Sequence, residues 1–149
     1  MTPEQMWTEF IAARPEFSGA KYEAWPYGCA PDELAELTLR GVKTATASAH
    51  PLYELEAAPL PCPGDLSVVL DGSDGAVCVI QTTRVTVLPF LEVPARHAWL
   101  EGEGDRSLAY WRQAHEAFFT RELREVGLAF APDMRVVCEE FEVLWPRKV

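Results

Sequence analysis

The sequence is poor in basic residues and has no long hydrophobic run. Lys and Arg number 13 against 23 Asp and Glu, which gives a formal net charge of −10 over 149 residues. This charge repels polyanions, so we expect any nucleic-acid contact to be local and no preference for DNA. No stretch approaches the roughly 20 apolar residues of a membrane span, and the start Met-Thr-Pro-Glu-Gln does not resemble a secretion signal. These absences predict a cytoplasmic protein without a membrane partner.

Cysteine motifs for metal binding are also missing. The four cysteines, Cys29, Cys62, Cys78 and Cys138, are widely spaced, with no Cys-x-x-Cys pair and no Cys/His cluster of the kind that zinc requires. Cys78 and Cys138 lie in apolar, strand-like runs. We therefore expect these two to be buried free thiols in a reducing compartment.

The length and composition suit one domain. With 48% hydrophobic and 11% aromatic residues, 149 residues are enough for one well-packed core and too few for two ordinary domains. A helix over about 3–13 is predicted at the start, because Thr2 and Gln5 form a capping-box pattern around Pro3. The chain is therefore expected to fold as a single domain over residues 1–149.

Hydrophobic periodicity predicts a curved sheet with helices, an α+β fold. Pro31 opens a second helix that Gly41 ends, and Ser107 caps a long one that runs to about Val126. Four prolines between His50 and Pro63 predict a long ordered loop there. A change of phase at Glu139-Glu140 predicts a β-bulge in the last strand. The remaining predicted elements are a short helix over 94–101 and strands over 44–48, 66–70, 76–87 and 134–145.

The most distinctive stretch runs from Gly41 to Ser48, where a helix end leads into a strand with one lysine and three hydroxyls. Thr44, Thr46 and Ser48 alternate, so they share one face of the strand. Either this is an edge strand with solvated hydroxyls and a surface Lys43, or the hydroxyls line a wet cleft.

Two aromatic residues and one histidine each allow two interpretations. Trp25 and Tyr27 lie in a segment broken by Pro and Gly, where they either stack on a base or fill the end of the core. His115 lies within the apolar stripe of the long helix, which favours a hydrogen-bonded core residue over a catalyst.

A second polar stretch, Glu101-Gly-Glu-Gly-Asp-Arg-Ser107, separates the two later helices. Its carboxylates, Glu101, Glu103 and Asp105, can surround a divalent cation. Acids just before a helix N-terminus also complement the helix dipole, so the spacing alone leaves both interpretations open.

Together these segments carry a resemblance. Gly41-x-Lys43-Thr44-x-Thr46, preceded by Trp25-Pro-Tyr-Gly and followed by Pro63-Gly-Asp and Glu101-Gly-Glu-Gly-Asp-Arg, resembles the ASCH-domain family, specifically its longer bacterial branch. The resemblance implies a PUA-like mixed β-barrel with flanking helices, in which residues of about 24–145 form the core. It also implies a cleft for RNA or nucleobases.

The resemblance implies two activities and leaves a third possibility. Longer members cleave single-stranded RNA with a divalent metal, Mn or Mg, and this makes a ribonuclease-like hydrolase the leading interpretation. Shorter relatives are amidohydrolases that deacetylate N4-acetylcytidine with a lysine, a threonine and a glutamate, which correspond here to Lys43, Thr46 and Glu101. A non-catalytic RNA-binding or nucleotide-binding module is the remaining alternative. No cofactor besides that metal is implied. The substrate-binding candidates are Trp25, Tyr27, Thr44, Ser48, Glu103 and Arg106.

The chemistry of both reactions centres on Lys43. In amide hydrolysis Thr46 attacks the acyl carbon, Lys43 takes its proton or holds the oxyanion once burial lowers its pKa, and Glu101 orients the pair. In RNA cleavage Lys43 neutralises the phosphate while the carboxylates hold a metal. Residues 43 and 46 of one regular strand face opposite sides, so we predict that Lys43 lies in the turn before the strand. Ser48 stands where short relatives carry arginine, which argues against an identical substrate.

Overall fold

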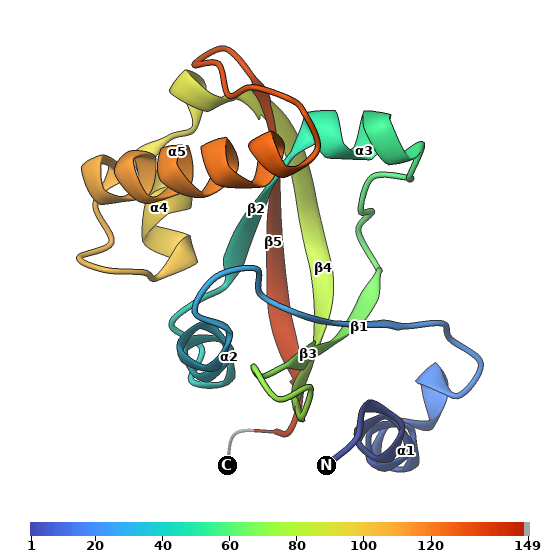
Figure 1. Ribbon diagram of the computed structural model, residues 1–149. Helices are drawn as coiled ribbons and strands as arrows, with labels where there is room; N and C mark the ends of the chain where they lie inside the picture. The colour runs from blue at the N-terminus through green and yellow to red at the C-terminus, as the bar shows by residue number, and fades with distance from the viewer. Residues whose placement is uncertain (148–149) are drawn as a thin grey trace.

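The computed structural model describes residues 1–147 as a curled five-stranded sheet with helices around it (Figure 1). The strand order is β1-β3-β4-β5-β2, and only the β1–β3 pair is parallel. The long strands β4 and β5 form the middle of this half-barrel. This confirms the predicted α+β fold. The strands are β1 Glu23–Pro26, β2 Ala45–Ala49, β3 Leu66–Leu70, β4 Ala76–Pro89 and β5 Arg135–Trp145.

The helices begin where the sequence predicts caps. The Thr2 amide donates to Gln5 Oε1 at 2.8 Å and the Gln5 amide donates to Thr2 Oγ1 at 3.1 Å, so the capping box is confirmed. Ser107 Oγ accepts from the Tyr110 amide at the start of the longest helix. None of the helices in the described part of the chain has both the length and the hydrophobicity of a membrane span. The helices are α1 Pro3–Ala13, α2 Pro31–Leu39, α3 His50–Glu56, α4 Ala95–Glu101 and α5 Leu108–Glu125, with 3₁₀ turns at Pro15–Phe17 and Phe90–Glu92.

Each large helix packs on a different part of the sheet. Phe119 and Leu123 of α5 pack in one cluster with Val136 of β5. Phe10 of α1 packs over β3 and β4, and Leu34 of α2 packs over the same strands in a third cluster. Cys78 and Cys138 are buried free thiols, as predicted. The segment that follows α2 leads into β2, which pairs with β5 of this sheet.

The predicted loop over His50–Pro63 is wrong in its first half. Residues His50–Glu56 form α3, and the loop begins only at Ala57, whose φ of 50° ends the helix. Pro51 lies in the first turn of α3, where a backbone N–H has no acceptor within the helix, so the N–H that proline lacks is not needed. Proline there starts a helix instead of preventing one.

The predicted bulge at Glu139-Glu140 is also wrong. The β4–β5 pair does contain two register shifts, but the unpaired residues are Thr83 of β4 and Leu144 of β5. The phase change in β5 arises because Val136 and Cys138 pack in the cluster under α5, whereas Phe141 packs in the cluster with α2. Two different cores contact one strand, and this alters the apolar phase without an inserted residue.

Candidate functional site

Lys43 lies in the turn between α2 and β2, as predicted. Gly41, with a φ of 77°, ends α2, and the amides of Val42 and Lys43 both donate to Leu37 O, at 3.0 and 3.1 Å. This turn directs the lysine inward, and its side chain is only 1% exposed. The alternative of a surface lysine is therefore excluded.

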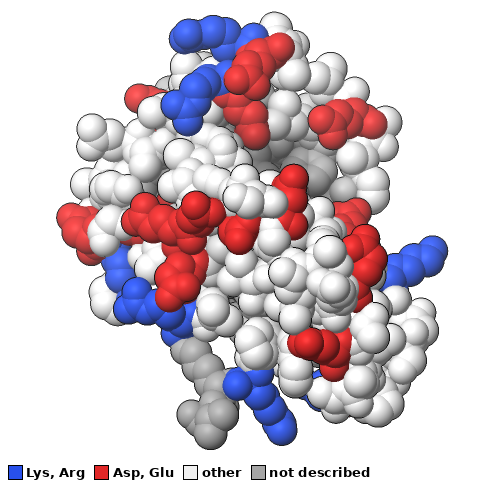
Figure 2. Space-filling model, turned by 60° about the horizontal axis from the view of Figure 1, so that its bottom comes forward, with Lys and Arg blue, Asp and Glu red and all other residues white. Residues whose placement is uncertain are grey.

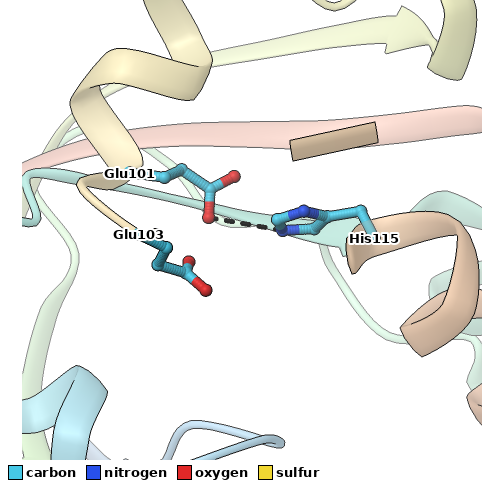
Figure 3. Close-up of side chains that lie close together, drawn as sticks. All are labelled: Glu101, Glu103 and His115. Atoms are coloured by element: carbon cyan, nitrogen blue, oxygen red, sulfur yellow. Dashed lines mark ion pairs between the residues drawn. The ribbon is translucent and has the colours of Figure 1, made fainter. Parts of the chain in front are cut away.

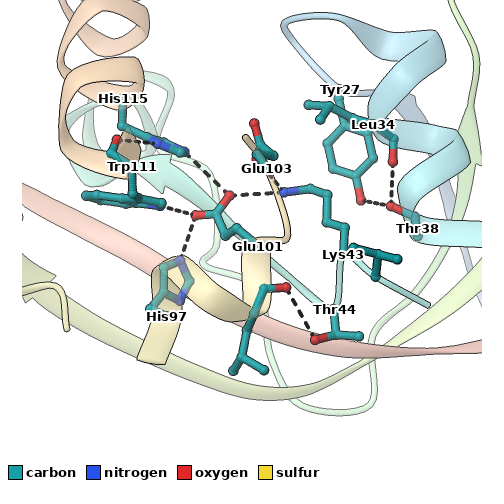
Figure 4. Close-up of polar contacts among 12 residues, drawn as sticks. Tyr27, Leu34, Thr38, Lys43, Thr44, His97, Glu101, Glu103, Trp111 and His115 are labelled. Carbon is teal, nitrogen blue, oxygen red and sulfur yellow. Dashed lines mark hydrogen bonds and ion pairs between the residues drawn. The ribbon is translucent and has the colours of Figure 1, made fainter. Parts of the chain in front are cut away.

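Two carboxylates hold the Lys43 ammonium. Its Nζ donates to Glu101 Oε1 at 3.0 Å and to Glu103 Oε2 at 2.9 Å, and it lies 5.1 Å from the centre of the Tyr27 ring (Figure 4). An ammonium carries three hydrogens. One of them therefore remains for a substrate oxygen.

Glu101 connects this lysine to the protein interior. Its Oε2 accepts from Trp111 Nε1 at 2.6 Å and lies 2.7 Å from His97 Nε2, while its Oε1 lies 3.4 Å from His115 Nε2. The carboxylate is buried, so these contacts leave it no free position for a ligand. Glu101 is therefore a positioning residue that fixes Lys43, and α4 and α5 hold it from both sides.

The pKa of Lys43 is raised, which corrects the expectation that burial would lower it. Burial alone does act in that direction, but the charges of Glu101 and Glu103 outweigh it. Lys43 therefore remains protonated and acts as a hydrogen-bond donor, not as a base.

Burial and the neighbouring charges also shift the pKa values of Glu101, Glu103 and His115. Burial raises the pKa of Glu101, but Lys43 and His115 outweigh it and hold that pKa well below its usual range. The pKa of Glu103 is raised, because burial and the charge of Glu101 outweigh the effect of Lys43. Burial lowers the pKa of His115, but the Glu101 carboxylate reverses the shift and raises it.

The group of possible metal ligands differs from the expected one. Glu101, Glu103 and His115 each offer a ligand atom, and these atoms lie within 4.8 Å of one another (Figure 3). Asp105, expected in this group, is exposed and instead accepts from the Ser107 amide at 2.9 Å. The Lys43 ammonium already lies between the two carboxylates, so a divalent cation would compete with it for the same oxygens. These residues do not fit a resident metal, and no chemical step below depends on one.

A cavity of about 1140 Å³ opens beside Lys43. The catalytic candidate Thr46 lines it, together with four of the predicted substrate-binding residues, Trp25, Tyr27, Ser48 and Glu103. The Tyr27 ring also belongs to the core, since it is buried and its hydroxyl lies 2.8 Å from Thr38 Oγ1. Tyr27 is therefore a core residue whose ring also borders the cavity.

Two predicted substrate-binding residues lie outside the cavity. The Thr44 hydroxyl donates to Leu100 O at 3.3 Å, which ties the turn to α4. Arg106 places its guanidinium 3.8 Å from the centre of the Trp99 ring and donates to Trp99 O at 2.9 Å. These contacts keep both side chains at the α4 end of the site.

The cavity lining is acidic. Seven acidic residues and two lysines contribute to it: Glu23, Glu33, Asp65, Glu101, Glu103, Glu122, Glu139, Lys21 and Lys43. Figure 2 shows acidic side chains gathered around a hollow on one face, with Lys and Arg toward the periphery. A ligand without negative charge suits such a lining better than a polyanion.

Sequence reasoning missed His97 and Glu139 as residues of the site. His97 precedes Glu101 by four residues on α4, so helical spacing could have indicated their contact. Glu139 of β5 is directly opposite Thr46 of the neighbouring strand β2, and this pairing depends on a strand register that the sequence does not reveal.

The family follows from comparison with known domains. The family model of the ASCH domain matches residues 23–145. The chain belongs to the ASCH domain family. No curated protein matches this chain significantly.

Solved structures of similar proteins share the fold. The ASCH domain from Lactobacillus crispatus JV V101 is 33% identical with a TM-score of 0.87, over 95% of this chain and 92% of that one. Protein EF3133 from Enterococcus faecalis V583 is 34% identical with a TM-score of 0.86, over 94% and 86%. The hypothetical protein PH0355, 19% identical with a TM-score of 0.51 over 82% of this chain and 96% of that one, is similar in fold alone. The PUA-like fold implied by the sequence motifs is thereby confirmed for this ASCH domain.

Gly102 packs closely against Val42 in the turn that carries Lys43, so its replacement should destabilise the fold. Its φ is 71°, and a Cβ there would lie 2.6 Å from Val42 O in the Lys43 turn. We expect Gly102→Ala to lower the free energy of unfolding by about 2 kcal/mol or more, measured by chemical denaturation.

Gly127→Ala is the matched control, because Gly127 has a φ of 77° but no atom within 4 Å of the added Cβ. It should cost only about 1 kcal/mol from the backbone conformation. Equal losses in both variants would mean that the contact between Gly102 and Val42 is not tight.

Proposed function

We propose that this ASCH domain is a hydrolase that removes an acyl group from a modified nucleoside of the N4-acetylcytidine type. The observation that carries the proposal is a buried, charged lysine beside a cavity that also contains a threonine hydroxyl. Thr46 would attack the acyl carbon, and Lys43 would donate its free hydrogen to the oxyanion. Glu101 keeps the ammonium in position.

The charge of the cavity supports a nucleoside over a polynucleotide. Seven of the nine Asp, Glu and Lys residues in the lining are acidic, and the buried cation, Lys43, is already paired with Glu101 and Glu103. A nucleoside carries no phosphate, so it avoids this repulsion. Trp25 is half-buried in the lining and offers a ring on which a base can stack.

Single-stranded RNA is the second candidate, and the size of the cavity favours it. A volume of about 1140 Å³ exceeds what one nucleoside fills, since pockets for single small ligands usually measure about 300–1000 Å³. In this reaction a ribose hydroxyl would attack the phosphate and Lys43 would neutralise the developing charge.

The test compares wild type and Thr46→Ala on N4-acetylcytidine, with release of cytidine as the measurement. We expect turnover by the wild type that EDTA does not abolish. We expect Thr46→Ala to lower kcat at least about a thousandfold, because no acyl-enzyme can form without the hydroxyl. Thr44→Ala is the matched control, since that hydroxyl bonds to Leu100 O outside the cavity, and it should change kcat only a few-fold.

Other outcomes select the alternatives. Cleavage of fluorescent single-stranded RNA without deacetylation would favour the second candidate, and binding without turnover of either substrate would identify a binding module. Equal activities of Thr46→Ala and Thr44→Ala would remove Thr46 from the reaction.

A further inference from the structure

We propose that Glu139 is the proton acceptor for the Thr46 hydroxyl, an inference that rests on the proposed acyl hydrolysis. Thr46 of β2 and Glu139 of β5 are directly opposite partners in an antiparallel pair. Such partners present their side chains on the same face of the sheet, with Cβ atoms about 4.5–5.5 Å apart. Both side chains line the cavity beside Lys43.

Only one of the two oxygens of the Glu139 carboxylate is held by a hydrogen bond. Its Oε2 accepts from Thr82 Oγ1 at 3.2 Å, which fixes the group against β4. Its Oε1 accepts no hydrogen bond from any residue within 1–147. One oxygen therefore remains available to a neighbouring hydroxyl.

The other charged groups at the Lys43 end, Glu101 and Glu103, belong to the ion pairs of Lys43 itself. Lys43 is protonated and cannot accept a proton, and both oxygens of Glu101 are occupied by four partners. Glu103 Oε2 accepts from Lys43 Nζ. Glu139 is the carboxylate that the strand register places beside Thr46.

The surroundings of Glu139 suit a proton acceptor. Burial, and then the charges of Asp65 and Glu23, raise its pKa, while the hydrogen bond from Thr82 opposes the shift. The charge of Glu139 in turn contributes to the raised pKa of Tyr53. A raised pKa brings the carboxyl group closer to neutral pH, where general bases work best.

The reaction then balances with water as the second reactant. Glu139 takes the Thr46 hydroxyl proton as Oγ1 bonds to the acyl carbon, and the carbonyl electrons move to the oxygen held by Lys43. When the tetrahedral intermediate collapses, the C–N bond breaks and Glu139 returns the proton to the leaving nitrogen. Water, deprotonated by Glu139, next attacks the carbonyl carbon of the Thr46 ester. When this second tetrahedral intermediate collapses, the bond from that carbon to Thr46 Oγ1 breaks and Glu139 returns the proton to Oγ1. The products are the carboxylic acid, the free nucleoside amine and the regenerated threonine.

The first experiment measures deacetylation across pH for wild type, Glu139→Gln and Glu142→Gln. We expect Glu139→Gln to lower kcat by about 10²–10⁴-fold with little change in KM. For the wild type we expect kcat to rise with pH in the acidic range, and this rise should be absent in Glu139→Gln. Glu139→Asp should recover part of the rate. Glu142 lies on the same strand but is exposed outside the cavity, so Glu142→Gln should behave as wild type.

A second measurement does not need turnover. In Thr46→Cys protein, the pKa of the introduced thiol is read from the pH dependence of alkylation, with and without Glu139→Gln. Loss of the neighbouring carboxylate should lower that thiol pKa by about one unit.

The outcomes separate the two proposals. An inactive wild type would overturn the proposed function, and the role of Glu139 with it. Activity that depends on Thr46 but survives Glu139→Gln would overturn the role of Glu139 alone. An alkylation profile of the Thr46→Cys protein that does not move when Glu139 is replaced would do the same.

Discussion

Replacing Glu101 with glutamine is expected to lower the free energy of unfolding by about 3 kcal/mol at pH 7, since breaking a buried ion pair costs about 3–5 kcal/mol. The side chains of Glu101 and Lys43 are each 1% exposed, and their charged atoms lie 3.0 Å apart. The amide keeps the shape of the carboxylate, so the loss reports the charge. Urea denaturation of both proteins measures it.

The pH dependence of this difference identifies its cause. The pKa of Glu101 is held below its unfolded value of about 4.3, so its stabilisation is complete above that pH and disappears as the pH falls toward the folded value. The difference in stability between the two proteins should therefore begin to shrink below about pH 4 and vanish as the pH reaches the folded-state pKa of Glu101. Glu103→Gln is the matched control: Glu103 contacts the same ammonium, but its pKa is raised, so its charge does not stabilise the folded state and we expect little or no loss. A difference that persists unchanged in acid would contradict the ion-pair explanation.

Replacing Lys43 with methionine is expected to lower kcat for the acyl substrate by about 10²–10³-fold with a smaller change in KM. Methionine keeps an apolar stem of similar length but donates no hydrogen bond to the oxyanion, and loss of one such donor has effects of this size. It also leaves the buried Glu101 carboxylate without its cation. Steady-state kinetics above and below KM separate the two parameters.

The control for this variant is Lys21→Met. Lys21 is the other lysine that lines the cavity, but it is exposed, and its loss should change kcat only a few-fold. Circular dichroism of both variants establishes that they fold. A folded Lys43→Met protein with the kcat of the wild type would show that the ammonium does not act in the transition state.

Local signals in the sequence predicted three helix ends correctly. The Thr2–Gln5 capping box, the Ser107 cap and Gly41 each act within a few residues, so they have the same effect in any fold. The same kind of signal failed at Pro51, because proline is compatible with both a loop and the first turn of a helix.

The sequence by itself determined the family, the position of Lys43 in a turn before β2, and the polarity of the segments that surround the cavity. Only the tertiary structure decided which of these groups meet. Lys43 and Glu101 are 58 residues apart, and their contact depends on how α4 docks beside β2. The tertiary structure also places His115 beside Glu101 and Glu103, whereas Asp105 lies outside this group. The sequence also could not predict the protonation of Lys43. Burial lowers its pKa and two carboxylates distant in sequence raise it, and only their distances in the fold decide which effect is larger.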